Sequence, residues 1–403
     1  MNLCTKHGAG LPARHLLVQF AAVAALLAGC GGGGDAGEAT SANATSSFAA
    51  GAISGFGSVI VNGVRFDDSR AEVTDDDGQA SDAASLRLGM QVEIHGGAFS
   101  DDGNGRRAEA RKIRFGSELV GPVTALDVAA KSLVVLGQTI LVIDTTVIDD
   151  RLAGGFASIV VGTVLEVHGT RDVATGAITA TRIEPKGAGA TFKLRGAVSD
   201  LDTTARTFRI GPTRVSYAGI APAPASLANG LVVRVKLQAV PVAGSFVATR
   251  LDAARPRIDD VDEAEIEGSI TAFTSATSFS VNGIPVDAGQ AAFPDGTTGL
   301  AIGARVEVRG TATNGVVVAS RVEVEDRAQG GAERFELHGP IAAIDTAAQT
   351  FLLRGTTVSY ASAAVDFRKG TRAQLAVGVR LEVRGSLSAD GTMLQATRIS
   401  FGD

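Results

Sequence analysis

The sequence predicts an all-β protein that contains five tandem small five-stranded barrels, preceded by a signal peptide and a flexible tether. Three observations lead to this prediction. A Gly-x-Ile/Val step recurs at intervals of about 70 residues. Within each interval, apolar and polar residues alternate, which is the period of a half-buried strand. The chain also has 50 glycines among its 403 residues, more than the usual share of about 7%. We therefore expect many tight turns.

Each copy of the repeat carries three short markers in a fixed order. The first begins at Gly51, Gly121, Gly196, Gly268 and Gly339. The second, Gly-x-x-Val/Leu-Glu-Val/Ile-x-Gly, begins at Gly89, Gly162, Gly303 and Gly378. The third, Ala-x-Lys/Arg followed by an aliphatic residue, begins at Ala110, Ala180, Ala248, Ala319 and Ala396. Copy three departs at its second marker, where Gly230–Leu237 lacks the glutamate and the closing glycine, so we expect its fourth strand to be extended or displaced.

The turn residues give the order of the strands in a copy. Asn62-Gly63 and Asn282-Gly283 are strong hairpin signals between the second and third strands. Asn314-Gly315 and Asp390-Gly391 mark a hairpin between the last two. The order is then three strands, an irregular or helical connection, and two strands. It fits a five-stranded barrel of the OB type, which also removes exposed sheet edges. A small open sandwich is the alternative.

The markers divide the chain into five repeats joined by polar linkers. The repeats cover residues 51–116, 119–186, 192–255, 264–326 and 334–403, and the linkers lie near 116–117, 185–190, 255–263 and 326–333. Each copy has its own alternating strands. We therefore expect near-independent folding units with small contacts between them.

The first 29 residues have the pattern of a secretion signal. Lys6 and Arg14 precede the apolar run Leu16–Ala28, which is shorter than the roughly 20 residues that a membrane-spanning helix needs. The run ends in Leu27-Ala28-Gly29-Cys30, which resembles the lipobox of bacterial lipoproteins. That resemblance implies acylation of Cys30, a stable anchor, and, because residue 31 is not aspartate, the outer membrane. A plain secretory signal is the alternative. Residues 30–50 carry the lipidated cysteine and a flexible tether.

The repeats themselves resemble a known family. The stretch Ile53–Val64 (ISGFGSVIVNGV), the second marker and the closing Ala-x-Arg-Ile are similar to a bacterial domain of unknown function, number five-six-six-six in that series. The resemblance covers nearly all of residues 51–400. It implies tandem copies behind a lipobox in envelope proteins. It transfers no catalytic or binding residue.

Repeated charges are interpreted as scaffold. The marker glutamates should face outward, where they either pair across strands with the basic residues of the closing marker or form a solvated face. The glutamates are Glu93, Glu166, Glu307 and Glu382, and the basic residues are Lys112, Arg182, Arg321 and Arg398. Lys+Arg of 37 against Asp+Glu of 43, with 5% aromatics, argues against a nucleic-acid binder.

Histidines and aspartates are the candidate metal ligands. His95 and His168 occupy a position that is arginine in copies four and five, so a solvated surface site is expected, and His338 has no partner histidine nearby. A zinc site needs three or four converging ligands, so we expect no metal site and no cofactor. Copy one carries three acidic clusters, Asp67-Asp68, Asp75–Asp77 and Asp101-Asp102. Turn chemistry explains such loops, and whether they bind calcium is left open.

The sequence offers no catalytic residues that we can name. It has no Gly-x-Ser-x-Gly elbow and no Ser-His-Asp set within one copy. The expected function is that of a non-catalytic, lipid-anchored cell-envelope protein, on the periplasmic or surface face, that presents tandem barrels to a protein or glycan. An oligosaccharide- or peptide-binding module is the alternative, and a hydrolase is less favoured.

Overall fold

The structure is a computed structural model that describes residues 46–101, 103, 105–172, 174–187, 189–221, 226–254, 258–324 and 335–402. The predicted signal peptide (1–29), Cys30 and most of the tether lie outside these residues. The described residues form 31 strands and three short 3-10 helices, with no α-helix. They contain no helix with the length and apolar character to cross a membrane. The all-β prediction is confirmed.

Repeat 2 shows how each barrel closes. Its strands are β9 (Leu119–Asp127), β10 (Ser132–Val135), β11 (Gln138–Leu141), β13 (Val164–Arg171) and β14 (Ile178–Pro185). They pair in the order β9-β10-β11-β14-β13 and back to β9. Only β11–β14 is parallel. This closed ring confirms the five-stranded barrel and is not an open sandwich. The connection holds β12 (Val147–Ile148) and η2 (Gly155–Ser158).

The other four repeats use the same pairing order, with their third and fifth strands parallel. Repeat 1 has β1 (Ser46–Phe56), β2 (Val59–Val61), β3 (Val64–Asp67), β4 (Glu72–Asp75), β5 (Ala80–Ser81), η1 (Ala83–Ser85), β6 (Gln91–Gly97), β7 (Ser100–Asp101) and β8 (Arg106–Gly116). Repeat 3 has β15 (Phe192–Asp202), β16 (Thr207–Ile210), β17 (Thr213–Ser216), β18 (Val232–Leu237) and β19 (Phe246–Ala253).

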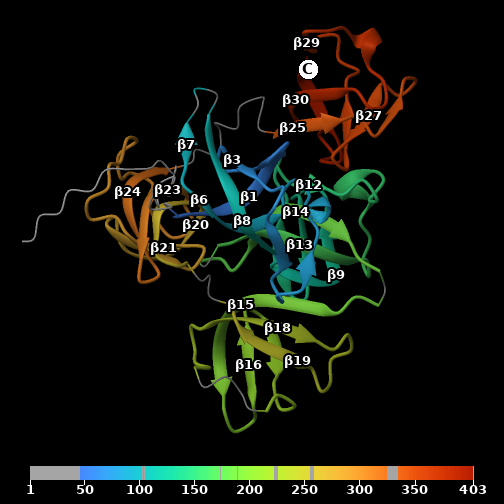
Figure 1. The fold of residues 1–403 in the computed structure, drawn as a ribbon. Coiled ribbons are helices and arrows are strands. Elements are labelled where there is room, and N and C mark those ends of the chain that lie inside the picture. Colours follow the sequence, from blue (N-terminus) through green and yellow to red (C-terminus); the bar gives the residue numbers. More distant parts are fainter. Residues whose placement is uncertain are drawn as a thin grey trace, which may run out of the picture. The chain divides into compact units, whose positions relative to one another are not determined.

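The last two repeats complete the chain, and colour separates the repeats from blue to red in Figure 1. Repeat 4 has β20 (Val261–Ser275), β21 (Ser278–Val281), β22 (Ile284–Asp287), β23 (Arg305–Thr313) and β24 (Val316–Val324). Repeat 5 has β25 (Phe335–Pro340), β26 (Ala343–Asp345), β27 (Thr350–Leu353), β28 (Thr356–Ser359), β29 (Asp366–Arg368), η3 (Arg372–Gln374), β30 (Arg380–Leu387) and β31 (Leu394–Phe401).

The predicted hairpins form where the turn residues indicated. Asn62 and Gly63 link β2 to β3 with φ of 53° and 74°, the positive pair that a two-residue hairpin turn requires. Asn282-Gly283 and Asn314-Gly315 do the same in repeat 4. The expectation for copy three is wrong, because β18 is neither extended nor displaced. Leu237 lies opposite Ala248, the register that closing glycines have in the other copies.

Strand β1 begins at Ser46, within the segment predicted as tether. Phe48 is 0% exposed and lies opposite His95 of β6 and Ala264 of β20. Phe48 therefore packs in the core of repeat 4, although it belongs to the strand that opens repeat 1. The apolar run Phe48-Ala49-Ala50 explains why the strand extends beyond the first marker.

The repeats are not independent units, so that expectation is wrong. One apolar core joins residues of repeats 1 and 5 and includes Val147 of repeat 2. A second core joins repeats 2 and 3, and the third combines repeat 4 with Phe48 and Ala50. Strand pairing crosses the boundaries as well. Strand β1 runs parallel to β20 and to β25, and β9 pairs with β15. These contacts bury backbone and apolar surface that separate barrels would leave exposed.

Candidate functional site

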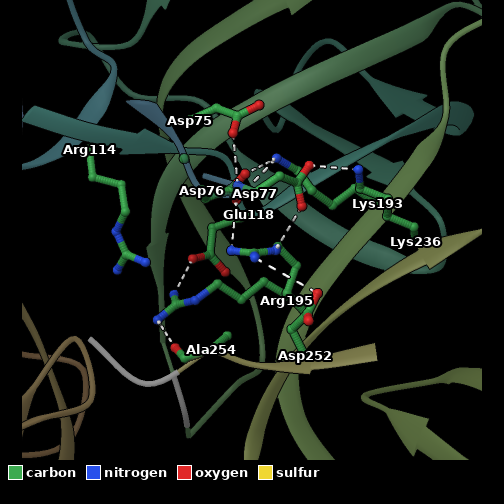
Figure 2. A network of polar contacts seen from close by, with 12 residues as sticks. Asp75, Asp76, Asp77, Arg114, Glu118, Lys193, Arg195, Lys236, Asp252 and Ala254 are labelled. Carbon is green, nitrogen blue, oxygen red and sulfur yellow. Dashed lines mark hydrogen bonds and ion pairs between the residues drawn. The ribbon is translucent and has the colours of Figure 1, made fainter. Parts of the chain in front are cut away.

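The most densely charged place in the described chain lies where a loop of repeat 1 contacts repeat 3 (Figure 2). The loop is Asp75–Asp77, at the end of β4. The Asp75 Oδ1 atom accepts hydrogen bonds from the backbone N–H groups of Asp77 (2.9 Å) and Gln79 (2.8 Å). This turn leaves the other two carboxylates directed at repeat 3.

Repeat 3 supplies three cations to these carboxylates. Lys193 of β15 lies 3.1 Å from Asp76, and Lys236 of β18 lies 2.7 Å from Asp77. Arg234 of β18 lies 3.5 Å from Asp76 and 3.6 Å from Asp77. Burial raises the pKa of Asp77, but the hydrogen bond and charge of Lys236 outweigh it, so this pKa lies below its usual value. Asp77 is therefore ionised at neutral pH.

A second ion pair continues the cluster into repeat 2. The buried carboxylate of Glu118 lies 2.5 Å from Arg195 of β15 and 3.6 Å from Arg171 of β13. Arg195 also donates to the carbonyl of Ala254 at 3.5 Å. Figure 2 shows Glu118 and Arg195 beside the aspartate loop. The network therefore connects three repeats through charges that neutralise one another.

A small cavity opens beside this network. Its volume is about 220 Å³. Its lining consists of Asp75–Asp77, Gln79–Ser81, Phe115, Gly116, Glu166, Lys186 and Lys193. Lys186 lies 2.5 Å from Glu166 and 2.8 Å from Glu184, so its charge is already balanced. The cavity can hold a few waters or a small polar molecule, and none of these lining residues is a histidine or cysteine that could serve as a nucleophile.

The acidic loop does not have the character of a calcium site. The three carboxylates of Asp75, Asp76 and Asp77 can converge, with oxygens within 4.8 Å of one another. However, Lys193, Arg234 and Lys236 already pair with Asp76 and Asp77, and a divalent ion would have to approach three positive charges. Asp67 and Asp101 cap turns by accepting the N–H groups of Ser69 and Gly103. Asp102 lies outside the described residues.

A second acidic group lies between repeats 1 and 5. Glu336, His338 and Glu382 converge within 4.8 Å, but Arg65 lies 2.5 Å from Glu336, and Arg384 lies 2.9 Å from Glu382. Burial raises the pKa of Glu336, but hydrogen bonds from His338 and Arg65 lower it to about 2. His338, expected to have no partner histidine, contacts this carboxylate and Arg65.

The predicted surface position of the marker histidines is wrong for His168. This side chain is 1% exposed, and its Nδ1 lies 2.8 Å from the carbonyl oxygen of Gly116, where repeat 1 meets repeat 2. His95 is half-buried, with its ring 5.0 Å from that of Phe48. The contact between repeats covers a position that would be solvated in a single barrel.

The predicted cross-strand pairs between marker residues are also wrong. The register places Glu93 opposite Arg114, and His95 opposite Lys112. Lys112, the basic residue of the closing marker, is thus two residues from the position opposite Glu93, and it lies opposite His95 instead. The glutamates instead pair with nearer cations: Glu93–Arg114 at 2.6 Å, Glu307–Arg309 at 2.6 Å, and Glu382–Arg384 at 2.9 Å.

Sequence reasoning missed the cations of the network, although a signal for them was present. In copy three, Arg234 stands where other copies have the marker glutamate, and Lys236 stands where they have histidine or arginine. This charge reversal in one copy matches the acidic run that only copy one carries at residues 75–77. The basic residues that are particular to copy three therefore contact the acidic residues that are particular to copy one.

Comparison with known proteins agrees with the repeat pattern. Residues 120–184, 267–323 and 338–400 match the family model described as Domain of unknown function (DUF5666). Three separate segments of the chain are therefore similar to that domain. These three matches lie within repeats 2, 4 and 5 and cover most of their barrel strands. They assign no activity to the copies.

One solved structure, titled "drosophila Unr CSD456", is 13% identical and covers 52% of this chain and 98% of its own. Its TM-score is 0.14, a value too low to support an argument about this protein. No curated protein matches the chain.

Proposed function

We propose that this is a non-catalytic protein of the bacterial cell envelope, anchored through acylated Cys30 to the outer membrane. Its tandem barrels bind a protein partner. The lipobox pattern supports the anchor and the envelope role. The candidate acids and bases of the central network neutralise one another, which supports a structural use of these charges over catalysis.

The observation that carries the binding role is an aliphatic patch on repeat 2. Val128, Leu141 and Ile143 are 50%, 39% and 40% exposed. Leu141 of β11 lies opposite Ser132 of β10, which lies opposite Asp127, the neighbour of Val128. The three residues therefore lie in the turn between β9 and β10, at the end of β11 and just after it. They are next to the second and third strands, the part of an OB barrel that binds ligands. Exposed apolar groups of this kind indicate interaction sites.

The character of the patch favours a protein over a glycan. Every phenylalanine and tyrosine in the described chain is buried or half-buried, whereas the large exposed apolar residues are Val, Leu and Ile. Sugar rings stack on exposed aromatic faces, while aliphatic patches pack against apolar side chains of a protein. The oligosaccharide- or peptide-binding alternative is supported by the polar cavity near Asp75–Asp77.

The anchor is tested by Cys30→Ser. The variant should lose acylation and leave the membrane fraction, because the single apolar run before Cys30 is too short to hold the chain. Detergent partitioning and mass spectrometry of the amino-terminal peptide measure both effects. If the variant still fractionates entirely with the membrane, the assignment of the anchor is incorrect.

The partner is tested by cross-linking in intact cells. Leu141→Lys combined with Ile143→Lys should remove a specific protein adduct, and Val240→Lys, at an exposed valine of repeat 3, should leave it in place. If both variants keep the same adducts, the patch is not the binding surface. If the wild-type chain captures glycans and no protein, the alternative function replaces the proposed one.

A further inference from the structure

Every repeat contains the same left-handed turn just before its fourth strand. The glycine of this turn has φ between 79° and 94° in each copy: Gly89, Gly162, Gly230, Gly303 and Gly378. The residues that precede these glycines are Leu88, Val161, Asn229, Ile302 and Val377. An apolar residue therefore precedes the glycine of this turn in four of the five copies.

In repeat 1 this turn is docked on the closing strand of repeat 2. The Thr181 hydroxyl of β14 donates to the carbonyl of Gly89 at 2.6 Å. The Arg182 guanidinium donates to the carbonyl of Leu88 at 3.4 Å. Leu88 is 1% exposed, and a Cβ atom on Gly89 would overlap the Thr181 carbonyl oxygen. The molecule thus contains one complete contact between a turn and a Thr-Arg pair.

In repeats 2 and 5 the equivalent turns are open. Val161 is 65% exposed and Val377 is 62% exposed. No heavy atom lies within 4 Å of a Cβ built on Gly162 or Gly378, leaving aside their chain neighbours. The turn of repeat 4 is partly covered, since Gly303 lies beside Asp172 of repeat 2.

The other half of the contact also recurs. The closing marker contains Thr-Arg at 181–182, 249–250 and 397–398. In repeat 5, Arg398 lies 3.5 Å from Asp366 and both residues of the pair are half-buried. In repeat 3, Thr249 and Arg250 are both exposed. The Thr249 hydroxyl donates to the carbonyl of Lys236 at 3.3 Å, and Arg250 pairs with Asp252 at 2.7 Å.

We propose that this chain associates with a second copy of itself through these elements. An open turn, Val161-Gly162 or Val377-Gly378, docks on the Thr249-Arg250 pair of the other copy and repeats the contact between repeats 1 and 2. The two surfaces differ, so the contact is heterologous and leads to open assemblies. Neither the anchor nor the aliphatic patch of repeat 2 takes part in the contact, and only its population in the cell rests on the proposed anchor.

One turn buries far less than the roughly 1,200 Å² of a stable interface, so association in solution is weak. Chains anchored in one membrane have a higher effective concentration, and there the contact becomes populated. Lysine at the tip of the turn would face Arg250 and repel it, which gives a charge-specific test of the geometry.

The test is sedimentation velocity of the full chain in density-matched detergent, over about 1 to 500 µM, the range in which weak interfaces associate. The wild-type mass should rise with concentration. The Val161→Lys/Val377→Lys variant should associate at least about fivefold more weakly. This change needs only a modest loss of binding free energy, because 1.4 kcal/mol corresponds to a tenfold change in Kd. Arg250→Glu added to that variant should restore association. Asn229→Lys, at the polar copy of the turn, should change nothing.

Two results would overturn the proposal. The first is a wild-type mass that stays that of the monomer across the range. The second is association that the double lysine variant leaves unchanged, which would assign self-association to another surface. The substituted valines are exposed, and thermal melts of each variant will establish that it is folded.

Discussion

Gly89 and Gly378 adopt the same backbone conformation in different surroundings, and so they separate local strain from contact between repeats. Their φ angles are 79° and 86°, which cost a side chain about 1 kcal/mol or more. Only Gly89 is covered, by Thr181 and Arg182. We expect Gly378→Ala to cost about 1 kcal/mol and Gly89→Ala about 2 kcal/mol more, because overpacked sites typically cost 1–3 kcal/mol. Urea unfolding measures both, and equal losses would show that the turn of repeat 1 is not docked.

His168 makes stability depend on pH. Burial lowers the pKa of its imidazole, so the folded state takes up a proton less readily than the unfolded chain does near pH 6.5. This contribution to stability is complete above that pH and is lost as the pH falls below it. Glu265 acts in the opposite direction, because burial raises its pKa to about 7 and its contribution decreases as the pH rises through that value.

The two effects are separated by comparing variants. Between pH 7.5 and 5.5 the wild-type free energy of unfolding should decrease relative to that of His168→Gln, because only the wild-type protein carries the imidazole whose pKa is lowered by burial. Urea unfolding at the two pH values provides the measurement. Parallel pH dependences in the two proteins would show that His168 does not bind its proton differently in the folded state.

At the scale of single residues, local turn chemistry was predictable from sequence and burial between repeats was not. Asn62-Gly63 fixes its hairpin because both residues tolerate positive φ. His168 has the same neighbours along its strand as His95 does. Its burial depends on Gly116 from the preceding repeat, and no pattern within one copy contains that information.

At the scale of elements, the alternation of apolar and polar residues predicted the strands, and the turn residues predicted their order. The register between paired strands determines which charged residues lie opposite each other. Glu93 and Lys112 belong to paired strands, yet Glu93 lies opposite Arg114. A shift of two residues keeps the same face outward, so the apolar pattern alone does not distinguish the two registers. The network at Asp75–Asp77 could have been found from the charge reversal in copy three, by asking which copy carries the complementary charges.

That network predicts how the acidic loop responds to calcium. Because Lys193 and Lys236 neutralise Asp76 and Asp77, Ca²⁺ on the order of 5 mM should leave the melting temperature unchanged. The Lys193→Ala/Lys236→Ala variant removes two of the cations that pair with Asp76 and Asp77. Ca²⁺ should therefore raise its melting temperature by several degrees. Sodium chloride of equal ionic strength is the control. A calcium-induced rise in the wild-type protein would contradict the ion-pair interpretation.

At the scale of the whole chain, the repeat pattern predicted five barrels but not their shared cores. Phe48 lies in the segment that the sequence predicts as a polar tether, because a single aromatic residue among small residues has no alternating apolar neighbours. In the structure it fills the core of repeat 4. Surfaces buried between barrels carry the same Val, Ala and Ile residues as barrel interiors, so composition does not separate the two.

The shared cores change what a core substitution should do. Val306 and Val308 of β23 point inward and are 0% exposed. Val306→Asp buries an unpaired charge, at a cost of several kcal/mol or more, which is comparable to the 5–15 kcal/mol stability of a whole domain. Independent barrels would confine the damage to repeat 4. Instead, β1 loses its partner β20 and the pocket for Phe48, so repeat 1 should open as well.

Limited proteolysis with mass spectrometry distinguishes these outcomes. Cleavage in the Val306→Asp variant should appear both within residues 261–324 and near 46–56, while residues 119–254, which have their own core, survive as a fragment. Val233→Asp in repeat 3 is the matched control, and it should expose repeats 2 and 3 and spare repeat 4. Cleavage confined to repeat 4 in the first variant would show that β1 does not depend on β20. Loss of every fragment at once would show that the three cores unfold as one, because cooperative units are defined by the contacts that fail together.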